Sequence, residues 1–222
     1  MSDMRLETVS GQIIDLMEPN PENIKLDDVA WALSRISRFC GHTITAVPYN
    51  VAQHSCSVLR LLVKFKKDPK PFVGSFSDNE IAWLSENLLI TDSKKVKCKA
   101  LLHDAHEAFT GDIPSPVKNL PDMKQTLKVL ESTLDNAIWE SLGLCSDDSD
   151  PYVFENEAKI VKAFDKMAQA IESYQFIQSR GKWFNMYTPS MMLLQEFDQP
   201  VPAIEAYNMF KDLYEGIKEG RL

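Results

Sequence analysis

Along most of this chain, apolar residues recur every three or four positions. This spacing favours helices over strands, and so do the scarcity of glycine, 8 residues in all, and the long stretches of Leu, Ala, Lys and Glu. With 222 residues the chain can bury one well-formed core. We therefore expect an all-α helical bundle, a single domain over residues 1–222, with a short extended arm at the N-terminus.

The expected elements follow from these segments and from the breaks between them. Residues up to about 26 alternate apolar and polar side chains before a turn, which indicates an extended arm with a short strand or hairpin. Asp27 or Asp28 could cap the first helix, and Asn50 opens the next. The polar, Pro- and Gly-bearing segment 66–80 is expected to be a surface loop that could cover or gate a pocket. Helices are expected over residues 29–39, 51–65, 81–90, 94–111, 121–143, 153–179 and 201–218.

The charge and the termini limit the classes of partner. A formal net charge of -8 disfavours long nucleic acid, which needs a basic surface, but a local pocket can still bind a small anion. No signal peptide is recognisable, and no apolar run reaches the roughly 20 residues that span a bilayer. We expect a cytoplasmic protein, of a cell or of a host cell, that binds no membrane and forms a homo-oligomer. The 4 cysteines have no close pairing and are expected to be reduced, mostly buried thiols.

Ionisable residues gather where the expected helix 94–111 ends. His103 and Asp104 follow an apolar run, Glu107 comes one turn later, and Asp112 follows the helix stop at Gly111. A His-Asp pair alone is usually solvated surface. Ionisable groups buried at the end of an apolar helix, however, are normally paired or bound to a metal. The group therefore indicates a site.

Two further residues face inward on other helices. His54 lies on the apolar face of its helix, where a hydrogen-bonded core histidine is the alternative. Asp165 lies on the inner side of a long helix, where a salt bridge to Lys or Arg is the alternative. With His103 and Asp104 they make two imidazoles and two carboxylates, a set that suits a divalent ion such as Mn, Fe, Co, Ni or Zn, with Mg a further candidate.

The pattern His54, His103-Asp104, Asp165 resembles the HD superfamily of metal-dependent phosphohydrolases. The string HDAHEAFTGDIPSPVK is similar to the 5′-deoxynucleotidase branch, and DDVAWALSRISRFCGHT with YNVAQHS resembles the viral dATP triphosphohydrolases. The resemblance covers roughly residues 9–180 and leaves a C-terminal helical extension over 181–222.

The resemblance implies a role for each matching residue. It implies that Glu107 orients or deprotonates water and that Asp112 is a second catalytic carboxylate. It implies that Arg38 and Lys118 bind phosphate, and we expect Phe39 to contact the sugar or base. The implied metal ligands are His54, His103, Asp104 and Asp165.

Residues with weaker signals are kept as candidates. His42 and His106 could contact the substrate, and Arg35 and Lys124 could meet distal phosphates; the alternative is that all four lie on the surface or in loops. The tryptophans are expected to be core residues rather than base-stacking platforms: Trp31, Trp83, Trp139 and Trp183.

Together these features predict a hydrolase for a small 5′-(deoxy)nucleotide, with a divalent metal ion as cofactor. The N-terminal signature favours a dNTP triphosphohydrolase with a purine substrate such as dATP. A 5′-deoxynucleotidase that releases inorganic phosphate from a dNMP is the alternative. A non-catalytic HD domain that senses a ligand or serves as an adaptor is the alternative of another class.

Overall fold

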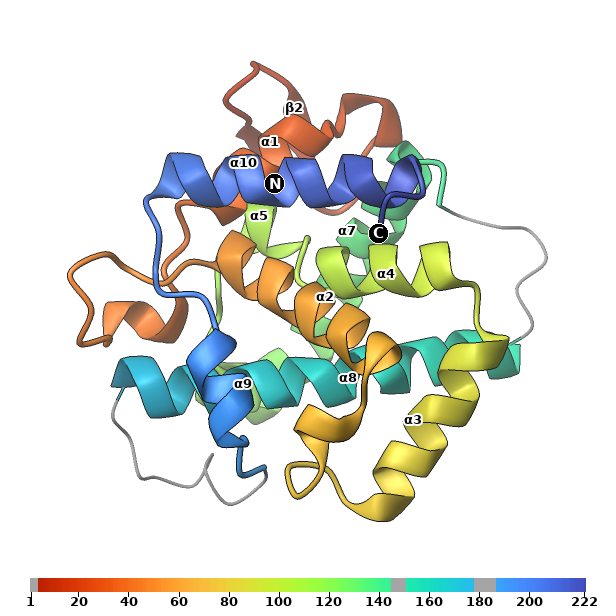
Figure 1. Cartoon of the computed structure of the whole chain (residues 1–222). Helices are drawn as coiled ribbons and strands as arrows, with labels where there is room; N and C mark the ends of the chain where they lie inside the picture. Colours follow the sequence, from red (N-terminus) through yellow and green to blue (C-terminus); the bar gives the residue numbers. More distant parts are fainter. Residues whose placement is uncertain (1–3, 145–150, 178–186) are drawn as a thin grey trace.

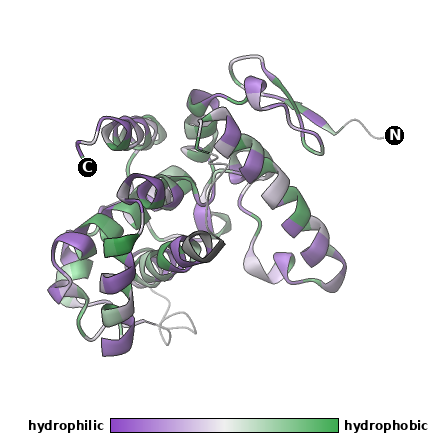
Figure 2. Cartoon of the chain, turned by 90° about the vertical axis from the view of Figure 1, so that its right-hand side faces the viewer, coloured by the Kyte–Doolittle hydropathy of each residue, from purple (hydrophilic) through white to green (hydrophobic). Residues whose placement is uncertain are grey.

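The computed structural model describes residues 4–144, 151–177 and 187–222, and their fold is helical apart from one small hairpin (Figure 1). Strand β1 (Arg5–Glu7) pairs antiparallel with β2 (Ile13–Asp15), with Leu6 opposite Ile14. Figure 2 shows this hairpin at the edge of the helical body and shows that the helices carry both apolar and polar residues along their length. The predicted all-α fold with an extended N-terminal arm is confirmed.

Helix α1 (Leu26–Leu33) is shorter than the expected helix 29–39. It is not capped by Asp27 or Asp28, because Lys25 holds the cap position and Asp28 instead accepts hydrogen bonds from Thr8 and Ser10 of the hairpin loop. Asp28 thereby ties the arm to the bundle. A short helical turn, η1 (Pro21–Asn23), precedes α1.

A left-handed turn, η2 (Arg38–Gly41), takes the place of the expected end of that helix. Phe39 and Cys40 have φ of 56° and 51°, and Gly41 follows with 76°. Residues with L side chains disfavour this region by roughly 1–2 kcal/mol each, so the turn is held by its surroundings. One such restraint is the hydrogen bond from Arg38 N–H to the carbonyl of Tyr49.

Helix α2 (Val51–Lys67) is the centre of the bundle (Figure 1). Asn50 caps it by accepting a hydrogen bond from Gln53 N–H at 2.9 Å, as the sequence predicts. Almost every residue of its first three turns is buried, because α4 (Ser93–Leu102), α8 (Pro151–Glu172) and α10 (Ala203–Lys218) pack around it.

Most of the segment 66–80 is exposed, as expected for a surface loop, but four of its residues are buried. That it gates a pocket stays a prediction. Phe72 in η3 (Lys70–Phe72) and Phe76 are buried and stack at 5.8 Å between ring centroids. Both meet Phe65 of α2 and Phe164 of α8 edge to face. We call these four rings the aromatic corner. The next helix, α3 (Asp78–Ile90), begins with a capping box formed by Ser77 and Glu80.

The expected helix 94–111 is divided in two. Helix α4 ends at Leu102, a turn occupies residues 103–106, and α5 (Glu107–Thr110) follows. The break leaves His103 and Glu107 on different elements, which the apolar periodicity alone does not reveal. The predicted stop at Gly111 is confirmed by its φ of 75°, and α6 (Ser115–Lys118) and α7 (Pro121–Ser141) come next.

The C-terminal third contains a short helix, at residues 191–196, that the sequence did not predict. Helix α8 passes into a π-helical turn, η4 (Ser173–Ile177), and α9 (Met191–Glu196) precedes α10. The end of the expected helix 153–179 and the position of Trp183 lie outside the described residues. Within the described ranges, no helix combines the length and the apolarity needed to cross a membrane. Cys56 and Cys98 are buried free thiols, Cys40 is an exposed one, and Cys145 lies outside the described residues.

Candidate metal centre

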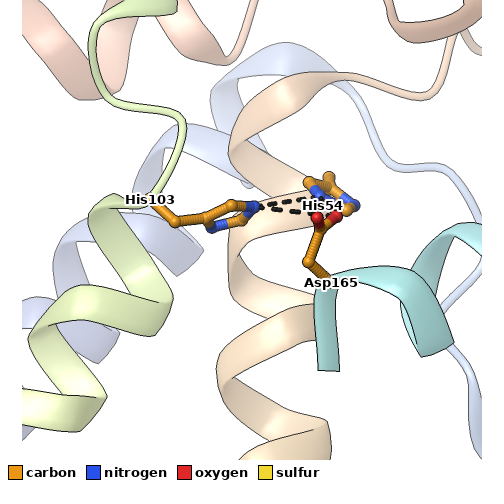
Figure 3. A group of neighbouring side chains, drawn as sticks. All are labelled: His54, His103 and Asp165. Carbon is orange, nitrogen blue, oxygen red and sulfur yellow. Dashed lines mark hydrogen bonds and ion pairs between the residues drawn. The ribbon is translucent and has the colours of Figure 1, made fainter. Parts of the chain in front are cut away.

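Three side chains from three helices meet at one point (Figure 3). His54 on α2, His103 directly after α4 and Asp165 on α8 place one ligand atom each within 4.8 Å of the others. The two Nε2 atoms are 3.2 Å apart, and Asp165 Oδ1 lies 3.3 Å from His54 Nε2 and 4.0 Å from His103 Nε2. Among the described residues this is the one group of His, Cys, Asp and Glu with such geometry.

The positions of these side chains follow from the packing of α2. His54 lies one turn into α2 and is fully buried at its contact with α8. His103 takes the C-cap position of α4, so its ring leaves the helix end towards α2. Asp165 lies on the buried side of α8 and is 4% exposed. Burial of three such polar groups is costly unless they share a partner.

The imidazole tautomers fit a cation. His54 Nδ1 lies 2.6 Å from Glu172 Oε1, and His103 Nδ1 lies 2.9 Å from the carbonyl oxygen of Ala100. Because both partners are acceptors, each Nδ1 carries the hydrogen in the neutral ring and each Nε2 presents a lone pair. Two lone pairs facing each other at 3.2 Å repel unless a proton or a metal ion lies between them. These residues therefore fit a divalent ion.

The pKa shifts of these residues show the same need for positive charge. Burial lowers the pKa of His103, but the carboxylates of Asp104 and Asp165 outweigh it and the net pKa is raised. Burial likewise works against ionised Asp165. Once protonated, His54 can donate a hydrogen bond to this carboxylate, and together with protonated His103 it holds the pKa of Asp165 well below the ordinary value. Asp165 also accepts hydrogen bonds from Lys162 at 2.6 Å and from Gln169 at 2.8 Å.

Asp104 lies beside the three-residue cluster and is also shared with an arginine. Its Oδ2 is 3.2 Å from His103 Nε2, 3.7 Å from His54 Nε2 and 3.6 Å from Arg38 Nη1. Of the four residues predicted as metal ligands, three form the tight cluster and Asp104 is adjacent to it.

Glu172 is a buried residue of the site that sequence reasoning missed. It lies on α8 seven residues after Asp165, which places both on one face of the helix. Its carboxylate accepts hydrogen bonds from His54, from Tyr49 at 3.1 Å and from Arg38 Nε at 3.2 Å. The seven-residue spacing from Asp165 is the one signal in the sequence that could have indicated it.

Glu107 is a buried carboxyl with an elevated pKa. Desolvation, together with the charges of Asp104 and Asp112, raises its pKa to about 8. Lys118 Nζ is 3.7 Å from Glu107 and 2.9 Å from Glu131. Lys118 thus lies beside Glu107 and already has acidic partners.

A cavity of about 540 Å³ opens beside the cluster, between α4, α7 and α8. His103, Asp104 and Asp165 form one part of its wall, and Trp139 and Leu144 form another. Its size suits a small molecule. The arrangement can therefore bring a ligand to the cluster from a largely apolar space.

Comparison with known proteins identifies the family. Residues 80–209 match the sequence profile of the family described as 5′-deoxynucleotidase YfbR-like. The chain belongs to the YfbR-like family. This confirms the resemblance seen in the sequence to the 5′-deoxynucleotidase branch.

Two curated relatives match parts of this YfbR-like chain. An uncharacterised protein of Rhodobacter capsulatus is 31% identical over 110 residues, which are 50% of this chain and 44% of the relative. The uncharacterised protein YfdR of Escherichia coli is 31% identical over 140 residues, which are 63% and 58% of the two chains. The chain spans about half the length of these relatives.

One solved structure is similar to the YfbR-like chain: the cyanophage S-2L HD phosphohydrolase DatZ, bound to dA and one catalytic Zn²⁺ ion. The TM-score is 0.42 at 19% sequence identity, over 88% of this chain and 98% of that one.

The remaining candidates of the YfbR-like chain lie in different surroundings. Arg35 is exposed and stacks on Trp31 at 3.3 Å, Lys124 and His42 are exposed, and none of them lines the cavity. His106 is buried and its Nδ1 lies 3.0 Å from Asp135 of α7. The expectation that the tryptophans are core residues holds in part. Trp31, Trp83 and Trp139 are half-buried, Trp83 and Trp139 pack against the core, and Trp139 also lines the cavity.

Proposed function

We propose that this protein is a metal-dependent phosphohydrolase that removes phosphate from a 5′-deoxynucleotide. The observation that carries the proposal is the pair of imidazole Nε2 atoms 3.2 Å apart with Asp165 beside them. His103 and Asp165 of this group line a cavity large enough for a nucleotide. Membership in the YfbR-like family, described as 5′-deoxynucleotidase, supports the same reaction and substrate class.

The residues that would hold the ion are His54, His103, Asp165 and the adjacent Asp104. A divalent ion bound there would polarise a phosphoryl oxygen and lower the pKa of a coordinated water. Glu172 would fix His54 in the tautomer that presents Nε2, as carboxylate partners of metal-binding histidines do.

Proton transfer is the role we assign to Glu107. A carboxyl whose pKa is raised to about 8 gains and loses a proton near neutral pH, which suits a general base or acid. It would take the proton of the attacking water, and Asp112 would assist at the leaving oxygen. Arg38, whose guanidinium lies 3.6 Å from Asp104, would neutralise charge on the phosphate.

The surrounding cations favour a monophosphate substrate. Arg38 is already paired with Glu172 and Asp104, Lys118 is paired with Glu131, and Arg35 stacks on Trp31 away from the cavity. A triphosphate would need more cationic contacts than these pairs leave.

One observation favours the dNTP triphosphohydrolase as a second candidate: three lysines line the cavity. These are Lys95, Lys99 and Lys162. Lys99 and Lys162 form ion pairs with Glu157 and Asp165, so a polyphosphate would have to compete for them.

The experiment that tests both is product identification. Metal-loaded protein is incubated with each dNMP and each dNTP, and early products are separated by chromatography. Orthophosphate and deoxynucleoside from a dNMP support the proposal, and tripolyphosphate from a dNTP supports the second candidate. If the metal-loaded protein hydrolyses none of the nucleotides, the catalytic function is wrong. The alternative of a non-catalytic, ligand-sensing HD domain is then favoured.

A further inference from the structure

The cavity between α4, α7 and α8 carries an inference about how the substrate's base is held, which rests on the proposed function. Each helix contributes one stripe of residues at spacings of three and four. The stripe of α7 consists of Ser132, Asp135, Asn136 and Trp139. The facing walls contain Leu102 of α4, and Ala158 and Val161 of α8.

The direction of α7 gives the cavity a metal end and a far end. Asp135 contacts His106, which follows His103 by three residues, so this part of α7 lies near the metal cluster. One turn later on α7, the ring of Trp139 lies 6.0 Å from Lys99 Nζ. Lys99 itself lies one turn, about 6 Å, before His103 on α4. Trp139 is therefore set back from the cluster along the cavity.

The far end of the cavity combines apolar side chains, one of them a flat aromatic ring, with lysines. Trp139 is half-buried there and Leu144 lies beside it, with Ala158 and Val161 also lining the space. Two lysines of α4 also line this end: Lys99, which is ion-paired with the buried Glu157, and Lys95, one turn further from His103. The aromatic ring among these aliphatic side chains suits a planar base that offers a π face.

Phe39 occupies a different place from the one its sequence position indicates. It does not line the cavity; it packs against the core, and the guanidinium of Arg38 lies 5.5 Å from its ring centroid. With the phosphate at the cluster and the sugar between, the base reaches the aromatic residue at the far end of the cavity. We infer that Trp139 is the stacking platform for the nucleobase and that Phe39 is not.

The first test compares substrates with and without a base. Deoxyribose 5-phosphate carries the same phosphate and sugar as dAMP but nothing that can stack. Loss of a base–aromatic stack costs between about 5-fold and 150-fold in affinity. In Trp139→Ala the ratio of kcat/KM for dAMP to that for deoxyribose 5-phosphate should fall by this factor, mainly through KM, and Trp139→Phe should retain most of it. Phe39→Ala is the matched control and should leave the ratio unchanged.

The second test measures binding alone and separates this inference from the proposed function. Deoxyadenosine, which has no phosphate to hydrolyse, should quench tryptophan fluorescence in the wild type, and the quenching should be lost in Trp139→Phe. The stacking role of Trp139 is overturned by any of three results. These are an unchanged kcat/KM ratio in Trp139→Ala, a fall of the ratio in Phe39→Ala, or full quenching in Trp139→Phe. If the protein hydrolyses no nucleotide but deoxyadenosine still quenches fluorescence through Trp139, only the catalytic function is wrong. The stacking role of Trp139 then stands.

Discussion

Helices α2 and α8 build two regions of opposite character. In the aromatic corner, Phe65 of α2 and Phe164 of α8 meet at 5.5 Å between ring centroids, in an apolar environment. In the metal centre, His54 of α2 and Asp165 of α8 meet at 3.3 Å. Phe164 and Asp165 are adjacent, and their side chains diverge by about 100° around the helix. One pair of helices thus supplies both the packing and the chemistry.

The difference between the two regions is one of tolerance. The aromatic corner is stable without any ligand, because its rings fill space and need no hydrogen bonds. The metal centre brings buried carboxylates and imidazoles together, and this arrangement is favourable only when a cation is bound. We therefore expect substitutions in the corner to change the free energy of unfolding, and substitutions at the centre to change metal binding and turnover.

The largest effect is expected for Asp165→Ala. Removing the carboxylate that faces both imidazoles should abolish metal binding and lower kcat/KM by roughly 1000-fold or more. The melting temperature of the metal-free variant should stay close to that of metal-free wild type, although activity is lost. Metal analysis, nucleotide turnover and thermal unfolding of the same preparation check this. A full metal complement in the variant would contradict the assignment of Asp165.

Phe72→Ala should have the opposite profile. Phe72 is fully buried among Phe65, Phe76 and Phe164, so its loss leaves a cavity and should lower the free energy of unfolding by about 3–5 kcal/mol. Turnover per folded molecule should stay within a few-fold of wild type. Urea unfolding measures the first quantity. The neighbouring Val73 is 60% exposed, and Val73→Ala, the control, should cost less than about 0.5 kcal/mol.

Glu107→Gln should separate activity from stability. Loss of the proton-transferring group should reduce turnover by about 100-fold while the metal stays bound. In the metal-free wild type, the Glu107 pKa is raised from 4.5 to about 8, so folding favours the protonated carboxyl. Its contribution to stability is fully present below pH 4.5 and is lost as the pH rises through 8.

The neutral Gln variant should therefore unfold like wild type at low pH and be more stable above pH 8, by on the order of 5 kcal/mol. Unfolding curves across this pH range check the sign. Glu140→Gln, at an exposed position of α7, is the control. Equal stability of the Glu107 variant and wild type at pH 9 would show that burial does not raise this pKa.

Asn50→Ala should give the smallest effect. The side chain caps α2 at Gln53 N–H, and such caps contribute about 1 kcal/mol. Asn50→Ser should restore most of that loss, since a hydroxyl can accept the same hydrogen bond. Because α2 carries both regions, the loss should appear as a uniform decrease in stability with no change in the metal affinity of the folded protein. A selective loss of metal affinity would contradict this and would show that Asn50 helps to position His54.

Local signals in the sequence predicted the elements that depend on local physics. The cap at Asn50 and the stop at Gly111 are set by side chains and backbone angles within one turn, and both were found. The inward positions of His54 and Asp165 follow from apolar periodicity on their own helices. That these side chains meet at one point depends on how the helices pack. The sequence predicted this only through the resemblance to a known family.

Features that depend on distant partners were missed. Phe72 and Phe76 lie in a Pro- and Gly-bearing segment and are buried because Phe164 covers them. The break after Leu102 has no local marker, since apolar spacing continues through the turn. Trp139 reads as an ordinary helix residue until α4 and α8 are placed around it.

The left-handed turn at Phe39–Gly41 has an evolutionary consequence. Two residues with side chains hold φ of 56° and 51° there, a conformation that glycine and asparagine adopt more readily. Drift within the lineage should therefore replace exposed Cys40 by Gly or Asn with a gain in stability, and should rarely admit Val or Ile. Phe39 has less freedom to change, because its ring packs against the core. Position 40 should vary among close descendants while position 39 stays aromatic.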